Sequence, residues 1–315
     1  MNLFQWSQNT PTGVFRNQKL SNKLYEAAIS KTVFVRFAQL MEDYSKGAGE
    51  TYDLARSANL AVPTNLGELT EDNSIPIDRN SMSKKQITIA EFGRGVQFTS
   101  KSKDLSRLNL PQMHRNELMK QMRLCMDQAA ANAFKSAQVK YTPLTVGSGS
   151  FNTSGSFGTA AANLNFYHLE RARDYAFGTL KVPGLNGEDD YCLITSWKGF
   201  RGLRDDPQFA KWNAPQNANV KFNGSMGKIE NVEIVVTNNT DALSASKGTG
   251  GVLGESVLFG ADAVAEIVAE QPELRMANTD FERKIAVAWY GMYAFDIIWD
   301  TGNVGEAKII HIGSA

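Results

Sequence analysis

The sequence predicts a mixed α+β fold built around one long helix. Three observations predict it: apolar residues recur at helical spacing over residues 109–138, β-branched and aromatic runs dominate from Val257 onward, and two alternating segments flank a polar tip between residues 46 and 100. The chain has 315 residues, of which 42% are apolar and 21% are charged. This composition is that of an ordinary globular protein, so most of the chain should fold around a sizeable core.

The N-terminal segment is predicted to be an extended arm followed by a short helix. Residues 1–20 are rich in Asn, Gln, Ser and Thr, and their aromatic side chains have no periodic partners (Phe4, Trp6 and Phe15). Exposed aromatics of this kind usually need a surface to dock on, either on the same domain or on a neighbour. Residues 22–42 then carry apolar residues at near-helical spacing, which predicts a short amphipathic helix.

Residues 46–100 are predicted to form a long projecting hairpin. Two segments with alternating apolar residues, 50–60 and 86–100, flank the polar stretch 67–85. Because so few apolar residues cannot form a core of their own, the hairpin should extend from the body and rest on something else, such as another subunit.

The clearest helix spans residues 109–138, with Pro111 in its first turn. At about 1.5 Å per residue, its roughly 28 residues give a rod of about 42 Å. Residues 146–163 are rich in Gly, Ser and Thr and are the best candidate for a domain boundary. A second module follows, with a helix-like LNFYHLERARDYAFGTL, a strand-like YCLIT, a helix-like SWKGFRGLRDDPQFAKW and a hairpin-like GKIENVEIVVTNN before the terminal strands.

Composition and motifs argue against a metal or membrane site. Lys plus Arg and Asp plus Glu both number 33, so no overall field attracts nucleic acid or membrane. The three histidines belong to no metal-ligand pattern, and we expect His114 and His311 to be surface or partly buried residues. Cys125 and Cys192 are expected to be reduced and buried. We therefore predict no metal, no cofactor and no membrane partner, in a protein that stays in the cytoplasm because its N-terminus lacks a signal-like apolar run.

Two acidic clusters and one glycine-rich loop are the remaining candidates for chemistry. The carboxylates of residues 188–190 and 205–206 could act as an acid–base pair if buried with separated pKa values, but adjacent acids in such turns are usually solvated. Residues 248–254 lack the Lys-Ser/Thr of a phosphate-binding loop and are more typical of a mobile loop. A cytoplasmic α/β enzyme using Asp189, Asp190 or Asp205 stays as an alternative, and it predicts a small oligomer with a polar pocket.

Basic residues gather between residues 101 and 123. Six of them stand against two acidic residues, Asp104 and Glu117; the six are Lys101, Lys103, Arg107, Arg115, Lys120 and Arg123. Such a stretch could contact polyanions without reading their sequence. A solvated helix face with spaced charge pairs explains it equally well.

Several motifs resemble the major capsid proteins of tailed bacteriophages, and one podovirus-type branch in particular. They are YEAAISKTVFVRFAQ from Tyr25, the hairpin arm GETYDLARSANL, GKIENVEIVVTNN, VLFGADAVAEI, and the terminal run from Thr279 to His311. They span nearly the whole chain and occur in family order, and the succession of elements also resembles that fold. These motifs are structural, so they identify a family by pattern and not by chemistry.

The resemblance implies a division of the chain into five segments. They are residues 1–45 as the N-terminal arm and short helix, 46–100 as the extended loop, 101–145 as the peripheral domain with its spine helix, 146–270 as the axial domain, and 271–315 as the C-terminal strands of the peripheral domain.

The resemblance also implies the function. We expect a protein without catalytic activity that forms hexamers and pentamers of an icosahedral shell around phage double-stranded DNA, assembled in the host cytoplasm and located in the virion capsid. Its expected partners are copies of itself, a portal protein, scaffolding and decoration proteins, and the packaged DNA without sequence preference. The alternative within the same fold is an encapsulin-like nanocompartment shell, which encloses enzymes.

Two sets of charged residues are predicted to act in the shell. At the tip of the hairpin an acidic block precedes a basic one: Glu68, Glu71, Asp72, Asp78, Arg79, Lys84 and Lys85. Exposed pairs within one hairpin contribute under about 1 kcal/mol each, whereas across a subunit boundary the same charges would set register. The basic residues of 101–123 are expected to face the shell interior and offset phosphate charge.

Overall fold

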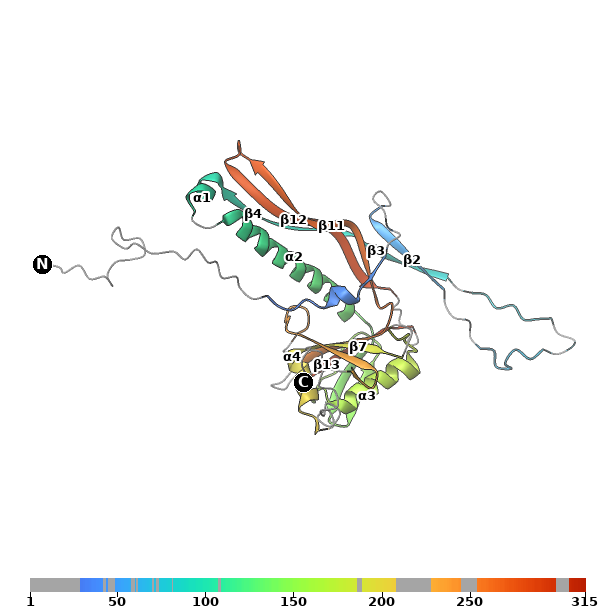
Figure 1. Ribbon diagram of the computed structural model, residues 1–315. Coiled ribbons are helices and arrows are strands. Elements are labelled where there is room, and N and C mark those ends of the chain that lie inside the picture. Colours follow the sequence, from blue (N-terminus) through green and yellow to red (C-terminus); the bar gives the residue numbers. More distant parts are fainter. Residues whose placement is uncertain are drawn as a thin grey trace.

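The computed structural model describes residues 29–41, 44, 49–57, 60, 62–69, 71, 74–80, 82–106, 109–185, 189–207, 228–244, 254–298 and 306–315. A four-stranded sheet and a long helix form one part of the molecule, a seven-stranded sheet forms the other, and a two-stranded hairpin projects sideways from their junction (Figure 1). This arrangement confirms the predicted mixed α+β fold.

The long helix is α2, Leu110–Lys135, and it confirms the predicted spine. Asn109 caps it, because its Oδ1 accepts a hydrogen bond from the backbone N–H of Gln112 at 3.3 Å. Pro111 lies in the first turn, where its missing N–H has no helical partner to lose. The buried side chains of the helix include Leu118, Ala130, Ala131, Ala133 and Phe134. A shorter helix, α1 (Ser100–Leu105), precedes it.

The four-stranded sheet packs on α2. Its order is β1 (Gln39–Leu40), β11 (Val264–Thr279), β12 (Lys284–Ile297) and β4 (Ala90–Thr99). The two long strands β11 and β12 pair antiparallel, and β12 pairs antiparallel with β4. Trp289 of β12 is buried against Leu118, and its Nε1 donates a hydrogen bond to Gln121 Oε1 at 3.3 Å. The strand and the helix are thereby fixed to each other.

The seven-stranded sheet is covered on both faces. Its order is β6 (Ser148–Asn152), β5 (Lys140–Thr145), β13 (Ile309–Ser314), β10 (Gly254–Phe259), β7 (Tyr191–Ser196), β9 (Val232–Thr237) and β8 (Lys228–Ile229). One face packs on α3 (Phe166–Asp174), its π-helical extension η3 (Tyr175–Thr179) and α4 (Trp197–Arg204). The other packs on the end of α2 and the 3-10 turn η2 (Phe34–Phe37). Strands β7, β10 and β13 are accordingly buried along their whole length.

The projecting hairpin consists of β2 (Thr51–Ser57) and β3 (Met82–Thr88), which pair antiparallel. A hairpin with its first strand in the predicted segment 50–60 is present, but its second strand begins at Met82, inside the stretch 67–85 that was predicted to be the polar tip. After Ile89 the chain continues into β4, which pairs with β12 in the four-stranded sheet. The predicted loop of residues 46–100 therefore contains one strand that belongs to the body of the molecule.

The predicted helix over residues 22–42 is wrong in its described part. Residues 29–41 contain one 3-10 turn, and Gln39 and Leu40 pair with β11 as the short strand β1. Here the backbone N–H groups of Val33 and Phe34 bond to the Asp127 side chain, so a contact distant in sequence replaces the helical hydrogen bonds. Residues 22–28 lie outside the described part.

Two strands, β13 and β6, belong to a different part of the molecule from the one that the sequence predicts. The terminal strand β13 pairs with β10 and β5 in the seven-stranded sheet, although residues 271–315 were grouped with the peripheral strands. The predicted linker 146–163 contains strand β6, which forms a hairpin with β5. Both differences have one cause: strand pairing is decided by partners far away in sequence, which local composition does not reveal.

Candidate assembly surfaces

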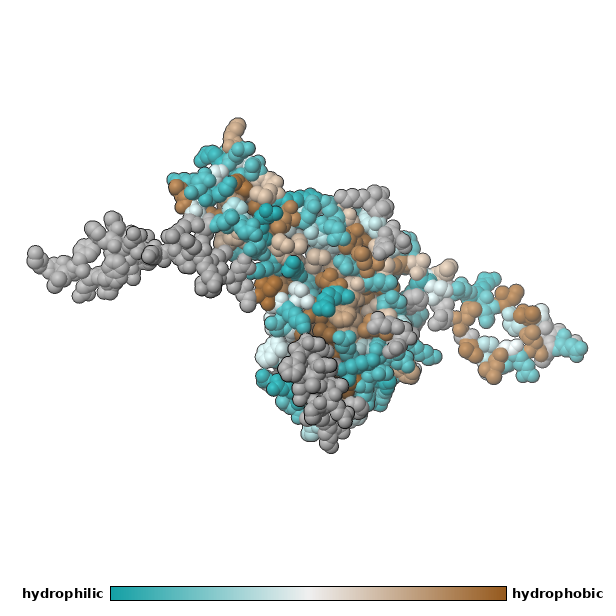
Figure 2. Space-filling model, in the orientation of Figure 1, coloured by the Kyte–Doolittle hydropathy of each residue, from teal (hydrophilic) through white to brown (hydrophobic). Residues whose placement is uncertain are grey.

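The region between β2 and β3 exposes a group of large apolar side chains. They are between 54% and 90% exposed: Leu60, Val62, Leu66, Leu69, Ile75, Ile77 and Met82. Figure 2 shows hydrophobic residues spread along this projection, away from the body. Contiguous exposed apolar surface marks interaction sites in soluble proteins. Our charge-based prediction missed this feature, although the sequence SIPIDRNSM contains its isoleucines.

The predicted charges of the tip fall into two groups. Glu68, Glu71, Asp78 and Arg79 are exposed on the projection, while Asp72 lies outside the described residues. Lys84 and Lys85 lie on strand β3 and have partners within the same chain. The Lys84 ammonium lies 2.9 Å from the Asp53 carboxylate on the paired strand β2, and this contact lowers the pKa of Asp53.

The two strands of the hairpin are tied to the body by two ion pairs. Lys85 Nζ lies 2.9 Å from Asp296 Oδ1 and donates a hydrogen bond to the carbonyl oxygen of Ile297 at 2.6 Å. Arg56 Nη2 lies 2.7 Å from Glu306 Oε2, and both of these side chains are mostly buried. Tyr52, Leu54 and Ile87 also pack against Ala265 and Ile267 of β11, so polar and apolar contacts from both strands set the direction of the hairpin.

A buried carboxylate fixes the chain at Val33 and Phe34. Asp127 of α2 is fully buried, and its Oδ1 accepts hydrogen bonds from the backbone N–H groups of Val33 and Phe34, each at 2.7 Å. Its Oδ2 accepts one from Asn239 Nδ2 at 3.2 Å. The Phe34 ring then packs against Phe134, with ring centroids 5.6 Å apart. The only signal for this site in the sequence is an acidic residue close to an apolar helix face.

The basic residues of 101–123 lie on α1 and α2. Lys101, Lys103, Arg115 and Arg123 are exposed, Lys120 is half-buried, and Arg107 lies outside the described residues. The exposure of Lys101, Lys103, Arg115 and Arg123 is compatible with a polyanion-facing surface and with a solvated one. Among the described residues, no helix is long and apolar enough to cross a membrane.

The three histidines have structural partners. His114 stacks on Phe98. His168 is fully buried and bonds through Nδ1 to the Tyr141 hydroxyl at 2.8 Å, and burial lowers its pKa. His311 is buried, with Nε2 at 2.7 Å from Glu255 Oε1 and Nδ1 at 2.8 Å from Lys140 Nζ. The expectation that His311 is a surface or partly buried residue is wrong, because β13 lies inside the seven-stranded sheet.

The cysteines are both free thiols. Cys192 is buried, as expected, whereas Cys125 is only half-buried. Burial raises the pKa of both thiols, so neither has the character of a reactive thiolate. Within the described residues, no group of three His, Cys, Asp or Glu side chains is arranged to hold a metal ion.

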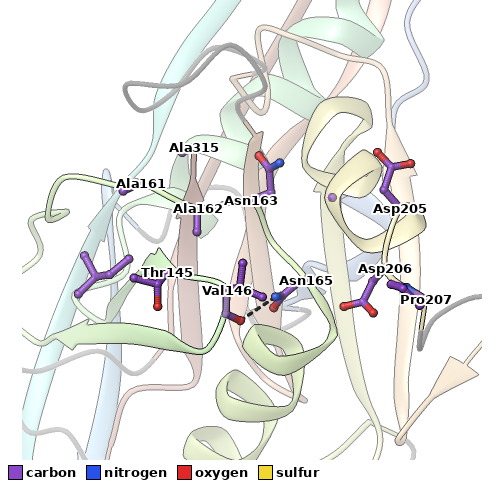
Figure 3. Close-up of a pocket in the computed structure, with 12 residues that line it drawn as sticks. Thr145, Val146, Ala161, Ala162, Asn163, Asn165, Asp205, Asp206, Pro207 and Ala315 are labelled. Atoms are coloured by element: carbon purple, nitrogen blue, oxygen red, sulfur yellow. Dashed lines mark hydrogen bonds between the residues drawn. The ribbon is translucent and has the colours of Figure 1, made fainter.

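The candidate carboxylates Asp205 and Asp206 line an open cavity of about 830 Å³ next to α3 and α4. Figure 3 shows that the two carboxylates point in different directions. Asp206 Oδ2 accepts a hydrogen bond from the backbone N–H of Phe166 at 3.1 Å, at the start of α3. Asp190 pairs with Lys228 at 2.6 Å, and Glu188 lies outside the described residues. These partners indicate structural roles for Asp206 and Asp190.

Comparisons with known proteins agree with one another. A family model described as phage capsid protein matches residues 83–304. The asymmetric unit of the cyanophage Pam1 capsid has a TM-score of 0.74 at 14% identity, covering 96% of each chain. The capsid of Ralstonia phage GP4 has a TM-score of 0.70 at 16% identity, covering 97% of this chain and 96% of that one. The head structure of Helicobacter pylori bacteriophage KHP40 has a TM-score of 0.66 at 13% identity, covering 100% of this chain and 99% of that one. No curated protein matches the chain.

Proposed function

The chain belongs to the phage capsid protein family as a major capsid protein of the virion shell, and on this basis we propose that its copies form hexamers and pentamers of an icosahedral shell around phage double-stranded DNA. The observation that supports this mode of assembly is the projection between β2 and β3. It carries exposed apolar side chains on a two-stranded hairpin, which cannot form a core by itself.

The apolar residues of the projection hold neighbouring copies together, and its charges select the register. Fully burying an apolar side chain contributes roughly 1.5–3 kcal/mol, so a contact that covers three of them contributes roughly 4–9 kcal/mol before ordering costs. An exposed ion pair contributes under about 1 kcal/mol. Glu68, Glu71, Asp72, Asp78 and Arg79 therefore act mainly by rejecting misaligned neighbours.

Lys84 and Lys85 have a different role in this proposal from the one expected at first. Their contacts with Asp53 and Asp296 stiffen the hairpin and its base. Lys84 and Lys85 stabilise the hairpin through contacts within the chain. The residues of the projection make the contact with the next copy.

The remaining partners follow from a shell that is filled with DNA. The basic set of 101–123, with Lys101, Lys103, Arg115 and Arg123 exposed, faces the interior and weakly offsets phosphate charge. A portal protein, and scaffolding or decoration proteins, would join the shell, which assembles in the host cytoplasm. The protein acts by assembling and carries out no catalysis. The encapsulin-like alternative is not favoured, because both the matching family and the solved structures are those of phage capsids.

The experiment that tests this proposal compares assembly with folding. Ile75 and Ile77 are both changed to Ser, and particles are followed by light scattering and negative-stain electron microscopy. We expect wild-type shells, and a double variant that stays folded by circular dichroism but forms no shells. The control is Val146→Ser, which removes an equally exposed apolar side chain from the β5–β6 turn of the body. Shells formed normally by the double variant, or a wild-type protein that stays monomeric, would contradict the proposal.

A further inference from the structure

The turn between β11 and β12 presents an aromatic side chain in an unusual way. Phe281 is 100% exposed. It stands between Asp280 and Glu282, and all three residues have a positive φ, at 56°, 52° and 67°. This conformation is unfavourable for residues other than glycine, and for a bulky side chain it is an outlier. Among the residues that the structure describes, no contact accounts for a strained turn that carries a fully exposed Phe.

The turn is held firmly in place. Thr279 and Lys284 pair across its base, and the N–H of Arg283 donates to the carbonyl oxygen of Asp280 at 3.0 Å. Ser100 adds two bonds: its N–H donates to the Arg283 carbonyl at 2.9 Å and its hydroxyl to the Glu282 carbonyl at 2.6 Å. The Phe281 ring is therefore presented by a preorganised backbone, which lowers the entropic cost of docking.

A cavity of about 350 Å³ lies beside the same turn. Its lining is rich in cations and contains one carboxylate: Thr99, Ser100, Lys101, Asp280, Arg283 and Lys284. The Asp280 carboxylate is 3.9 Å from both the Arg283 and the Lys284 head groups, which is too far for a close ion pair. The cavity thus has an excess of positive charge next to a wall formed by the turn.

We propose that Phe281 of one copy inserts into the cationic cavity formed by Lys101, Arg283 and Lys284 of a second copy. An aromatic ring carries negative charge density on its faces and is attracted to Lys and Arg head groups within about 6 Å. The ring and the cavity lie on the same tip, so copies related by a two-fold or a three-fold axis form the contact repeatedly with one pair of surfaces. The inference rests on the proposed shell function and names a second contact, separate from the β2–β3 projection.

Two variants of Phe281 distinguish a ring–cation contact from simple apolar burial. Phe281→Tyr keeps the aromatic face, whereas Phe281→Leu keeps apolar volume without it. We expect Phe281→Leu to raise the threshold protein concentration for assembly at least about tenfold, and Phe281→Tyr to stay within about threefold of wild type. Since the side chain is fully exposed, the thermal melting of both variants should match that of wild type.

The cavity is tested with Arg283→Met, which removes a charge from a side chain that is 81% exposed. We expect a similar rise in the threshold protein concentration for assembly. The Phe281→Leu, Arg283→Met double variant should have the same threshold as Phe281→Leu alone, because both changes remove the same contact. Additive effects, or wild-type assembly by Phe281→Leu, overturn the inference and leave the shell function standing. If only Arg283→Met has an effect, and that effect is loss of copurifying DNA, the cavity is a phosphate site instead. A wild-type protein that never assembles overturns both proposals.

Discussion

The seven-stranded sheet and the β2–β3 hairpin place their apolar side chains in opposite surroundings. Strands β7, β10 and β13 are buried at every position, between helices on one face and the end of α2 on the other. The projection between β2 and β3 leaves side chains such as Leu66 and Ile77 almost fully exposed. Since a sheet becomes stable by covering its faces, the first region completes its fold within one chain, whereas we propose that the apolar side chains of the second are covered by another copy.

The largest expected effect comes from reversing the charge of the projection, which tests whether this region needs another copy. Changing Glu68, Glu71 and Asp72 to Lys should abolish shells, because like charges would then meet where complementary ones set the register. Thermal melting of the subunit should stay near wild type, since Glu68 and Glu71 are exposed. Electron micrographs and circular dichroism report the two outcomes separately. Normal shells, or a collapsed subunit, would show that the projection is not an intersubunit clasp.

A change inside the body should instead lower the stability of the subunit itself. Asp127→Ala leaves the buried N–H groups of Val33 and Phe34 and the amide of Asn239 without their acceptor. At about 1–3 kcal/mol for each unsatisfied group, we expect a loss of about 3 kcal/mol or more in the free energy of unfolding. Asp127→Asn, which keeps one acceptor, should lose less.

Urea unfolding measures this effect, and it is best done in the Ile75→Ser, Ile77→Ser background so that assembly does not add to stability. The exposed Asp104→Ala on α1 is the matched control and should change little. A loss below about 1 kcal/mol in Asp127→Ala would mean that water replaces the carboxylate, in conflict with the buried site described here.

The smallest expected effect concerns Glu230 in the β8–β9 turn and its neighbour Glu170 on α3. Glu230 has a positive φ of 47° in the β8–β9 turn, and burial together with Glu230, Asp174 and Asp206 raises the pKa of Glu170. A raised carboxyl pKa means that the folded state binds more protons than the unfolded one, so stability is lost as pH rises through that interval. Glu230→Gly should add about 0.5–1 kcal/mol near pH 7 by relieving the backbone.

Glu230→Gln separates the two causes, since it keeps the strained backbone and removes the charge. We expect its gain over wild type to be present near pH 7 and to vanish at about pH 3, which lies below the ordinary Glu pKa, so that Glu170 is protonated in both states. Unfolding midpoints at the two pH values measure this difference. An equal gain at both values would assign the effect to something other than charge.

Elements defined by local pattern were predictable from the sequence, and elements defined by distant contacts were not. The α2 helix carries its own cap at Asn109 and its own periodicity, and strands such as β7 and β12 carry β-branched and aromatic runs. Residues 29–41 have a helix-like spacing, yet Asp127 captures their backbone. The burial of His311 likewise follows from its pairing with strands that precede it by many residues.

The candidate surfaces also contain features that the sequence predicts and features that depend on distant contacts. The sequence predicts that a hairpin projects, and Glu68, Glu71, Asp78 and Arg79 are exposed there; their contact with another copy stays a prediction. It did not show that Lys85 bonds to Asp296, because that contact joins a hairpin strand to the end of β12. The exposed Phe281 was also missed, since a single Phe between two long strands reads as part of a buried sheet.

The strands of the hairpin are held to the body by apolar packing as well as by ion pairs. Tyr52, Leu54 and Ile87 pack with Ala265 and Ile267 of β11. Arg56 pairs with Glu306 one residue before the end of β2, so the two strands are held along most of their length. Because a packed core resists any change of shape, we expect β2 and β3 to move with the body. Differences in curvature between positions in a closed shell would then have to be taken up beyond these two strands.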